Sequence, residues 1–86
     1  MTQYDIEISK TAEQQLKKLN PDNQRRVVRA ILALAGEPQP RGSRKLSGYD
    51  DVFRIRVGSY RVIYSVSGNR LVVIILKIGH RKDVYR

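Results

Sequence analysis

The segment of residues 52–64 constrains the fold more than any other part of this chain. Apolar and polar residues alternate over residues 53–57 and 60–62, on either side of Gly58-Ser59, and this pattern predicts two strands joined by a two-residue turn. A primed turn of this length needs a positive φ at its first position, where glycine is favoured. The segment therefore predicts a β-hairpin whose register is set by the turn.

The predicted register gives the hairpin one apolar face and one basic face. The apolar cross-strand pairs are Val57 with Tyr60, Ile55 with Val62 and Phe53 with Tyr64. On the basic face Arg56 lies opposite Arg61, and Arg54 lies diagonally to Arg61. Like charges directly opposite one another disfavour folding, so the arrangement is more favourable with a phosphate oxygen between them. The alternative is a solvated outer face, because exposed strand faces are commonly charged.

The N-terminal half predicts a strand followed by a helical hairpin. Residues 3–8 alternate as a short strand, and Ser9 can cap a first helix. Asn20-Pro21 ends that pattern and begins a second helix, which we expect to end near Gly36. Residues 37–42 are rich in proline and glycine and predict a surface loop.

The C-terminal half predicts an antiparallel meander. Residues 44–46 suit a short edge strand, and residues 70–78 form a strand that is apolar on both faces. Such a strand is central, but its register stays open because either pairing buries aliphatic side chains. We expect Gly79 to end it. The sequence thus predicts a single α+β domain over residues 1–86, with the helices on one face of a small twisted sheet and the arginines on the other.

Charge is concentrated in the C-terminal half. The formal net charge is +9, and residues 41–86 contain eleven Lys/Arg against three Asp/Glu. A one-sided basic field attracts nucleic acid, an acidic membrane surface or an acidic protein, and composition does not choose among them. The chain has no cysteine, and the apolar run of residues 71–76 is far too short to span a bilayer. We expect a cytoplasmic protein that is not embedded in a membrane.

The composition argues against most enzyme chemistries. With one histidine, no cysteine and few carboxylates in the basic half, a metal site is not expected, and no segment resembles a nucleophile elbow. We expect no metal and no cofactor. An arginine cluster does suit RNA cleavage by the ribose 2′-hydroxyl, in which the protein aligns the reacting atoms and stabilises the charged transition state.

Such a reaction needs a proton acceptor, because arginine is always charged and is a poor base. Tyr85 is the favoured candidate, since nearby guanidinium groups would stabilise its phenolate. His80 is the rival, although a histidine at a strand end is commonly only a hydrogen-bonding residue. We expect the tail after Gly79 to curl over the end of the meander, bringing Arg81 and Tyr85 to the hairpin arginines.

Several motifs together resemble the RelE branch of the RelE/ParE toxin superfamily, and the resemblance covers essentially the whole chain. The motifs are Lys-Leu-Ser-Gly at 45–48, Phe-Arg-Ile-Arg at 53–56, Tyr-Arg-Val-Ile-Tyr at 60–64 and Gly-His-Arg-Lys-Asp-Val-Tyr at 79–85. The resemblance implies a ribosome-dependent endoribonuclease that cuts mRNA in the decoding site, next to 16S rRNA, and is neutralised by a cognate antitoxin.

The resemblance also implies individual roles. Arg54 and Arg56 match basic phosphate-contacting positions, which are often lysine in the family, and Arg61 matches the residue that supports the transition state. Arg81 matches the residue assigned to the leaving group, and Tyr85 matches the one assigned to proton abstraction or stacking. The further residues that we expect to contact RNA are Arg44, Lys45, Lys77, His80 and Lys82.

Two other functions remain open from the sequence. The first is a ParE-like toxin that inhibits DNA gyrase by binding, although such chains generally lack the full set of basic residues and tyrosine. The second is a non-catalytic RNA-binding module, in which phosphate contacts alone explain the arginines and binding falls steeply with salt.

Overall fold

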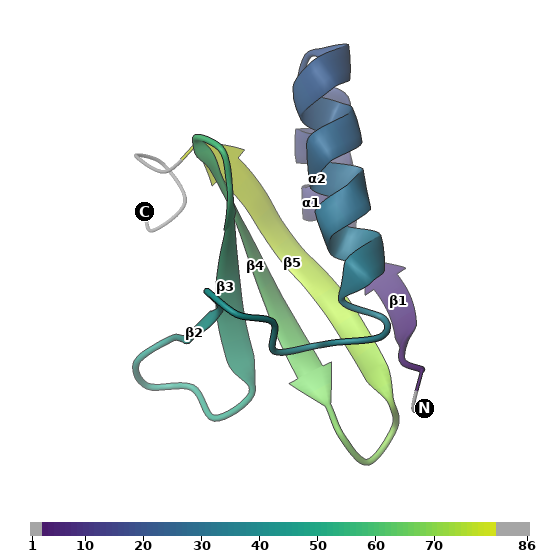
Figure 1. Ribbon diagram of the computed structural model, residues 1–86, viewed down its shortest axis with the longest axis vertical. Coiled ribbons are helices and arrows are strands. Elements are labelled where there is room, and N and C mark those ends of the chain that lie inside the picture. Colours follow the sequence, from purple (N-terminus) through teal and green to yellow (C-terminus); the bar gives the residue numbers. More distant parts are fainter. Residues whose placement is uncertain (1–2, 81–86) are drawn as a thin grey trace.

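The computed structural model describes residues 3–80, which form two helices and one five-stranded sheet (Figure 1). In chain order the elements are β1 (Asp5–Ile8), α1 (Lys10–Lys17), α2 (Pro21–Ala33), β2 (Arg44–Lys45), β3 (Val52–Val57), β4 (Tyr60–Ser67) and β5 (Val72–His80). The predicted α+β order of strand, helical hairpin and meander is confirmed. Neither of these helices is long and apolar enough to cross a membrane.

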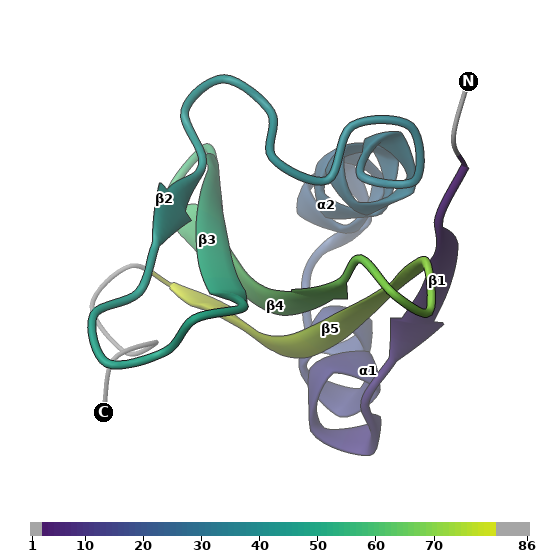
Figure 2. The same cartoon turned by 90° about the horizontal axis from the view of Figure 1, so that it is seen from below.

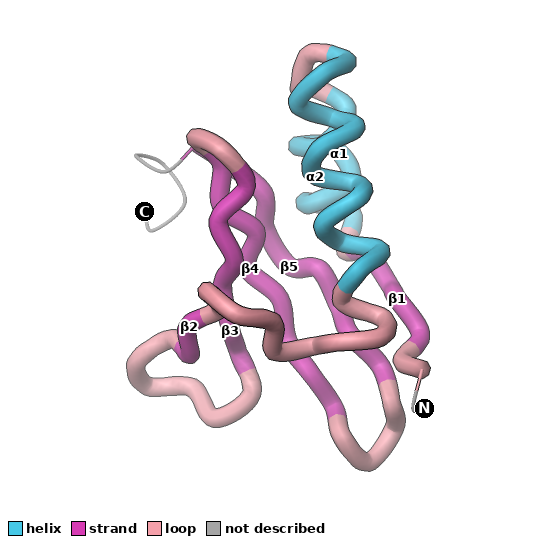
Figure 3. The backbone as a smooth tube through the Cα atoms, viewed as in Figure 1, coloured by secondary structure: helices cyan, strands magenta, loops and turns pink. Residues whose placement is uncertain are grey.

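The strands follow the order β1-β5-β4-β3-β2 across the sheet. Strands β2 to β5 pair antiparallel in sequence, whereas β1 pairs parallel with β5. A parallel neighbour needs a crossover connection, and here the helical hairpin begins that path. Figure 2 shows the strong twist of the sheet between β1 and β2, and Figure 3 shows the long loop that joins α2 to the β2 edge.

The hairpin of β3 and β4 has the register predicted from its turn. Val57 pairs with Tyr60, and Arg56 pairs with Arg61. Gly58 has a φ of 60°, a left-handed conformation that glycine adopts without steric cost. The turn chemistry therefore determines which hairpin side chains share a face.

Side-chain caps begin both helices. The Oγ of Ser9 accepts a hydrogen bond from the Ala12 amide at 3.0 Å and donates one to the Leu76 carbonyl at 3.0 Å. The Oδ1 of Asn20 accepts one from the Asn23 amide at 2.9 Å. Ser9 therefore ties α1 to the central strand as well as capping it.

Replacing Ser9 with alanine should lower the free energy of unfolding by about 1–2 kcal/mol, because it removes a cap and leaves the Leu76 carbonyl without its donor. Chemical denaturation measures this loss. Asn20→Ala is the matched control, because that residue caps α2 without a described second bond. A loss for Ser9→Ala no larger than for Asn20→Ala would show that the contact with Leu76 contributes nothing.

Both helices pack on one face of the sheet, as predicted. A single buried cluster joins residues from both helices with alternate residues of the three central strands. Its members are Ala12, Val27, Ile31, Leu34, Phe53, Ile55, Val62, Tyr64, Val73, Ile75 and Ile78. The opposite face of β3 and β4 is left for the arginines.

A bulge resolves the register that the sequence left open. Ile63 pairs with Lys77 and Tyr64 pairs with Ile75, so Leu76 is the extra residue of β5. The bulge lets Ile75 and Ile78 both face the core while Lys77 points to the other side. Hydrogen bonds from α1 support this region, where the Ile78 amide donates to Gln15 Oε1 at 2.7 Å.

The expectation that Gly79 ends the last strand is wrong. β5 continues through Gly79 to His80, because the two residues pair with Arg61 and Tyr60 of β4. Pairing to a neighbouring strand outweighs the weak strand preference of a single glycine.

Candidate active site

Arg56 and Arg61 form the centre of the site. They pair directly across β3 and β4, and Gly79 of β5 pairs with Arg61 on its other side. Because cross-strand partners point to the same face, both guanidinium groups lie on the side of the sheet away from the helices. Gly79 has no side chain, so β5 places nothing beside Arg61 in this row. Arg56 is exposed and Arg61 is half-buried.

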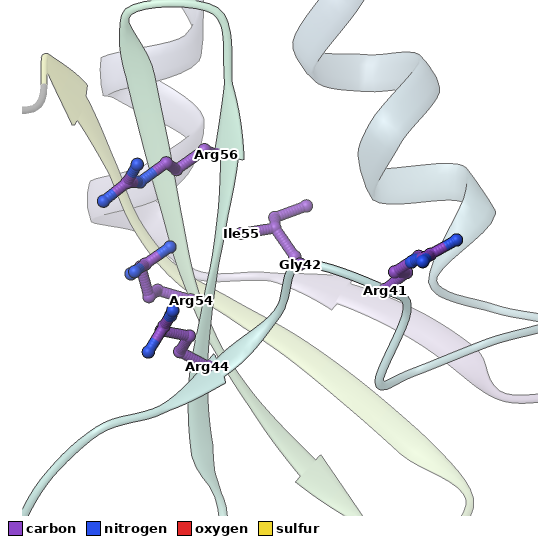
Figure 4. A pocket seen from close by; sticks show the side chains of 6 residues that line it. All are labelled: Arg41, Gly42, Arg44, Arg54, Ile55 and Arg56. Carbon is purple, nitrogen blue, oxygen red and sulfur yellow. The ribbon is translucent and has the colours of Figure 1, made fainter.

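A second row of cations runs beside the first. Arg44 of β2 pairs with Arg54 of β3, Arg54 pairs with Ile63 of β4, and Ile63 pairs with Lys77 of β5. Figure 4 shows Arg44, Arg54 and Arg56 pointing to the same side of the sheet. We call the set of Arg44, Arg54, Arg56, Arg61 and Lys77 the arginine face. The fold thus brings five of the predicted site residues together.

Arg54 is buried although it carries a charge. Its relative exposure is 8%, and burying a cation without a partner is costly. Among residues 3–80, the ion pairs join Glu13 with Lys17 and Asp22 with Arg25, both on the helices. No carboxylate in this part of the chain pairs with Arg54 or with its neighbours Arg44 and Arg56. A bound anion would offset the cost of this arrangement.

The basic residues of β2 and β3 border a hollow at the edge of the sheet. This pocket of about 540 Å³ is lined by Arg41, Gly42, Arg44, Arg54, Ile55 and Arg56. Arg41 was not predicted from sequence, because its loop reaches β3 only through the long connection after α2. Its guanidinium points away from those of the other three arginines (Figure 4). A smaller hollow of about 130 Å³ lies at the hairpin tip, beside Arg56 and Arg61.

Lys45 and His80 lie on the face opposite to the arginine face. Lys45 pairs with Phe53, and His80 pairs with Tyr60, so both belong to rows that face the helices. The His80 ring contacts the Tyr60 ring edge to face, with centroids 5.9 Å apart. The structure therefore separates these two predicted RNA contacts from the arginines.

Three predicted site residues, Arg81, Lys82 and Tyr85, lie outside the described residues, and their roles stay predictions. Within residues 3–80, no group of three or more histidine, cysteine, aspartate or glutamate side chains is placed to hold a metal ion.

Tyr64 holds the loop that precedes β2. The side chain is fully buried on the core face, and its hydroxyl donates a hydrogen bond to the Pro38 carbonyl at 2.7 Å. Burial raises the pKa of Tyr64 to about 12, while a hydrogen bond with the Ser43 side chain acts in the opposite direction. The loop that carries Arg41 and leads to Arg44 is thus tied to the core at two points.

Comparison with known proteins gives concordant results. Residues 6–85 match the family model described as ParE toxin of type II toxin-antitoxin system, parDE. The chain is 34% identical to "Putative toxin RelE1" of Methanocaldococcus jannaschii, over 96% of both chains. It is 36% identical to "Toxin RelG" of Mycobacterium tuberculosis, over 96% of this chain and 97% of that one.

Solved structures share the whole fold. An archaeal RelE-RelB complex from Pyrococcus horikoshii has a TM-score of 0.83 at 37% identity, covering 98% of this chain and 100% of that chain. The toxin-antitoxin complex RelBE2 from Mycobacterium tuberculosis also has a TM-score of 0.83, at 32% identity, covering 96% and 97%.

A helical hairpin packed on a five-stranded sheet is thus a fold that this chain shares with proteins of toxin-antitoxin complexes. The chain belongs to the RelE/ParE toxin superfamily. Its similarity to RelE toxins places it in the RelE branch, as its motifs predicted.

Proposed function

We propose that this protein is a ribosome-dependent mRNA endoribonuclease that inhibits translation in the cytoplasm. The observation that carries the proposal is the buried cation Arg54 beside the cross-strand pair Arg56 and Arg61, on a face where no described carboxylate neutralises Arg54 or Arg56. Such a cluster fits the phosphodiester group, which concentrates negative charge on oxygens matched to guanidinium donors.

The proposed reaction needs no nucleophile from the protein. The ribose 2′-oxygen attacks the adjacent phosphorus and loses its proton to a base, and the bond from phosphorus to the 5′-oxygen of the next nucleotide breaks. The departing oxygen takes a proton, leaving a 2′,3′-cyclic phosphate and a 5′-hydroxyl end. Arg56 and Arg61 would bind the non-bridging oxygens, whose charge increases in the transition state. No metal ion is needed for this role.

The spacing of the basic residues also suits a nucleotide strand. Arg54 and Arg56 are two residues apart on β3, a distance of about 6.6 Å along a strand, which is comparable to the separation of successive phosphates in an extended single strand. Arg44 continues the same series at the sheet edge. We propose that Arg54 and Arg44 bind phosphates next to the scissile group, and that Lys77 adds to the same field.

The base and the leaving-group acid are proposed from the family resemblance, as Tyr85 and Arg81. Because His80 lies on the opposite face, against Tyr60, we assign it no role in proton transfer. Lys82 remains a proposed contact with RNA.

We also propose that a cognate antitoxin binds this chain, because the structures of its relatives include RelE-RelB and RelBE2 toxin-antitoxin complexes. An exposed cationic surface is a ready target for an acidic, partly disordered partner.

Purified protein incubated with mRNA and ribosomes should cut the message within the decoding site and leave 2′,3′-cyclic phosphate ends. Tyr85→Phe should slow single-turnover cleavage by about a hundredfold or more, the usual scale for general base catalysis. His80→Gln should leave the rate within about twofold of the wild type, because its ring lies on the other face. End mapping with and without ribosomes measures both effects.

A control variant makes this test specific. Arg70→Ala removes an exposed arginine in the turn before β5, far from the arginine face, and should cleave normally. Intact message in the presence of bound protein would contradict the nuclease proposal and favour a simple RNA-binding module.

Gyrase inhibition is the second candidate, because the matching family model describes ParE toxins. A supercoiling assay with purified DNA gyrase distinguishes the two. Inhibition of gyrase without cleavage of mRNA on ribosomes would replace the nuclease proposal.

A further inference from the structure

The loop of residues 46–51, between β2 and β3, carries an aromatic side chain that neither the core nor the proposed reaction uses. Tyr49 is 60% exposed, and within residues 3–80 its ring packs against no other aromatic ring. The other aromatic residues of this range are buried or packed against the core, and they are Tyr4, Phe53, Tyr60 and Tyr64. A single exposed aromatic residue is ordinary by itself, so the argument for a role depends on the loop that holds it.

Backbone hydrogen bonds fix the conformation of this loop. The Leu46 amide donates to the Val52 carbonyl at 2.9 Å, and the Tyr49 amide donates to the Leu46 carbonyl at 3.3 Å. The second bond closes a four-residue turn whose third residue, Gly48, has a φ of 85°, as a type II turn requires at that position. Nothing lies within 4 Å of the place where a Cβ would stand on Gly48, so glycine is needed there for backbone conformation and not for space. Tyr49 is therefore presented on an ordered turn, which lowers the entropy cost of binding.

The loop continues the arginine face at the edge of the sheet. Arg44 of β2 is the outermost cation in the row that contains Arg54, and the loop begins directly after β2. It extends from the β2 edge away from both helices (Figures 1 and 2). Its other end is tied to the sheet, because the Asp51 carbonyl accepts a hydrogen bond from the Val66 amide at 2.9 Å. A nucleotide strand whose phosphates follow Arg54 and Arg44 would reach this loop next.

The side chains of the loop suit a nucleobase better than a phosphate. Asp50 and Asp51 follow Tyr49 directly and are exposed. Carboxylates repel a phosphate, but they accept hydrogen bonds from the N–H groups on base edges, and a tyrosine ring offers a flat surface on which any base can stack. A hollow of about 450 Å³, lined by residues 45–50, leaves room beside the ring.

We propose that Tyr49 stacks on a base of the bound message, on a nucleotide next to the phosphates held by Arg54 and Arg44. The inference rests on the proposed function in that it takes the ligand to be mRNA on the arginine face. Tyr49 would touch none of the reacting atoms, so it is a binding residue that fixes the path of the strand past the sheet edge. Because every base has a flat face, this contact would tolerate different sequences.

A protein partner fits this loop less well. The exposed large apolar residues of the described chain are Ile8, Leu32, Tyr49 and Leu71, and of these only Tyr49 belongs to the loop. An interface core needs a cluster of apolar side chains with few charges, whereas here one ring is followed by two carboxylates. Ribosomal RNA offers the same stacking chemistry as the message, and the test below separates the two.

The test uses ribosomes programmed with a message that cannot be cut. Methylation of the ribose 2′-oxygens across the decoding-site codon removes the attacking hydroxyl, and 2-aminopurine replaces one base of the message at a time. Stacking on an aromatic ring quenches the fluorescence of this base. At one position, wild type and Tyr49→Phe should quench the signal, whereas Tyr49→Ala and Tyr49→Leu should not. The leucine variant is the matched control, because it keeps an apolar side chain but has no ring.

Single-turnover cleavage of unmodified message should show a loss of binding and not of chemistry. Tyr49→Ala should raise the half-saturating protein concentration by about tenfold, within the range of about 5- to 150-fold that one stacked base contributes. The maximal rate should stay within about twofold of the wild type. Leu71→Ala removes an exposed apolar side chain from the turn before β5 and should change neither quantity. Since Tyr49 is exposed, all these variants should unfold at close to the wild-type temperature.

The outcomes separate this inference from the nuclease proposal. Equal quenching by wild type and Tyr49→Ala at every position would reject stacking on the message, and normal cleavage by the wild type would leave the nuclease proposal intact. Slower cleavage by Tyr49→Ala with unchanged quenching would also reject it, and would assign the ring to ribosomal RNA. If the wild type neither cut the message nor quenched the signal at any position, the nuclease proposal and the stacking contact would both be overturned.

Discussion

Replacing Arg56 and Arg61 together with alanine should abolish detectable RNA cleavage while leaving the free energy of unfolding close to that of the wild type, or higher. The two residues pair directly across β3 and β4, and their guanidinium groups would carry most of the charge stabilisation in the proposed transition state. Loss of one preorganised donor typically slows a reaction by about 10²–10³-fold. The double variant should therefore lose about a thousandfold or more in the single-turnover rate.

The expected effect on stability has the opposite sign, because like charges directly opposite one another in a sheet are destabilising. Their removal should leave the free energy of unfolding within about 0.5 kcal/mol of the wild type, or raise it. Chemical denaturation measures this quantity alongside the cleavage assay. A fall in both stability and activity would mean that the pair is structural.

The matched control for this variant is Lys18→Ala combined with Arg70→Ala. Both residues are exposed and lie away from the arginine face, so the control removes the same formal charge. It should cleave RNA at close to the wild-type rate. An equal loss of activity in the control would show that total charge, and not the geometry of the arginine face, governs cleavage.

Removing the side chain of Tyr64 should cause the largest loss of stability of any substitution considered for this protein. The ring is fully buried and stacks against Phe53, with centroids 6.0 Å apart. Tyr64→Ala should lower the free energy of unfolding by about 3–5 kcal/mol, as is usual when a large aromatic residue is truncated in a core. Thermal and chemical denaturation measure this loss.

The Tyr64→Phe variant measures the contribution of the hydroxyl group alone to stability. This variant keeps the ring but removes the hydrogen bond to the Pro38 carbonyl, and should cost about 1–2 kcal/mol. It should also weaken RNA binding, because the loop leading to Arg44 loses one of its ties to the core. Wild-type affinity for RNA would show that the loop is held without Tyr64.

Tyr64 also predicts a dependence of stability on alkaline pH. Burial raises the folded-state pKa of Tyr64 to about 12, above the value of about 10 that is usual for a tyrosine in an unfolded chain. Between these values the unfolded chain has released the phenolic proton while the folded chain keeps it, so stability falls as pH rises. The contribution is fully present below pH 10 and is lost toward pH 12. The Tyr64→Phe variant should lose less stability over this interval, and identical pH profiles would contradict the assignment.

The hairpin shows what local chemistry can specify. Gly58 at the turn and the alternation of residues around it predict the pairing of Arg56 with Arg61 that the structure shows. Ser9 and Asn20 likewise predicted the starts of both helices. In these cases the residues that decide the structure are neighbours in the chain, so the local sequence pattern is sufficient to predict it.

The faces on which Lys45 and His80 lie could not be predicted from local sequence. Lys45 is placed by its pairing with Phe53, a contact between separate segments, and His80 by the continuation of β5 through Gly79. If β5 is expected to end at Gly79, the pattern assigns His80 to neither face of the sheet. Both residues were expected near RNA, and the sheet placed them on the helical side.

From its sequence alone, this chain specified the order of its elements, the register of the β3–β4 hairpin and the gathering of arginines on one face, because periodicity and turn chemistry act over a few residues. Tertiary structure alone decided the parallel pairing of β1 with β5, the bulge at Leu76 and the burial of Arg54. Each of these depends on which distant segment lies alongside, and a strand that is apolar on both faces carries no local signal for that choice.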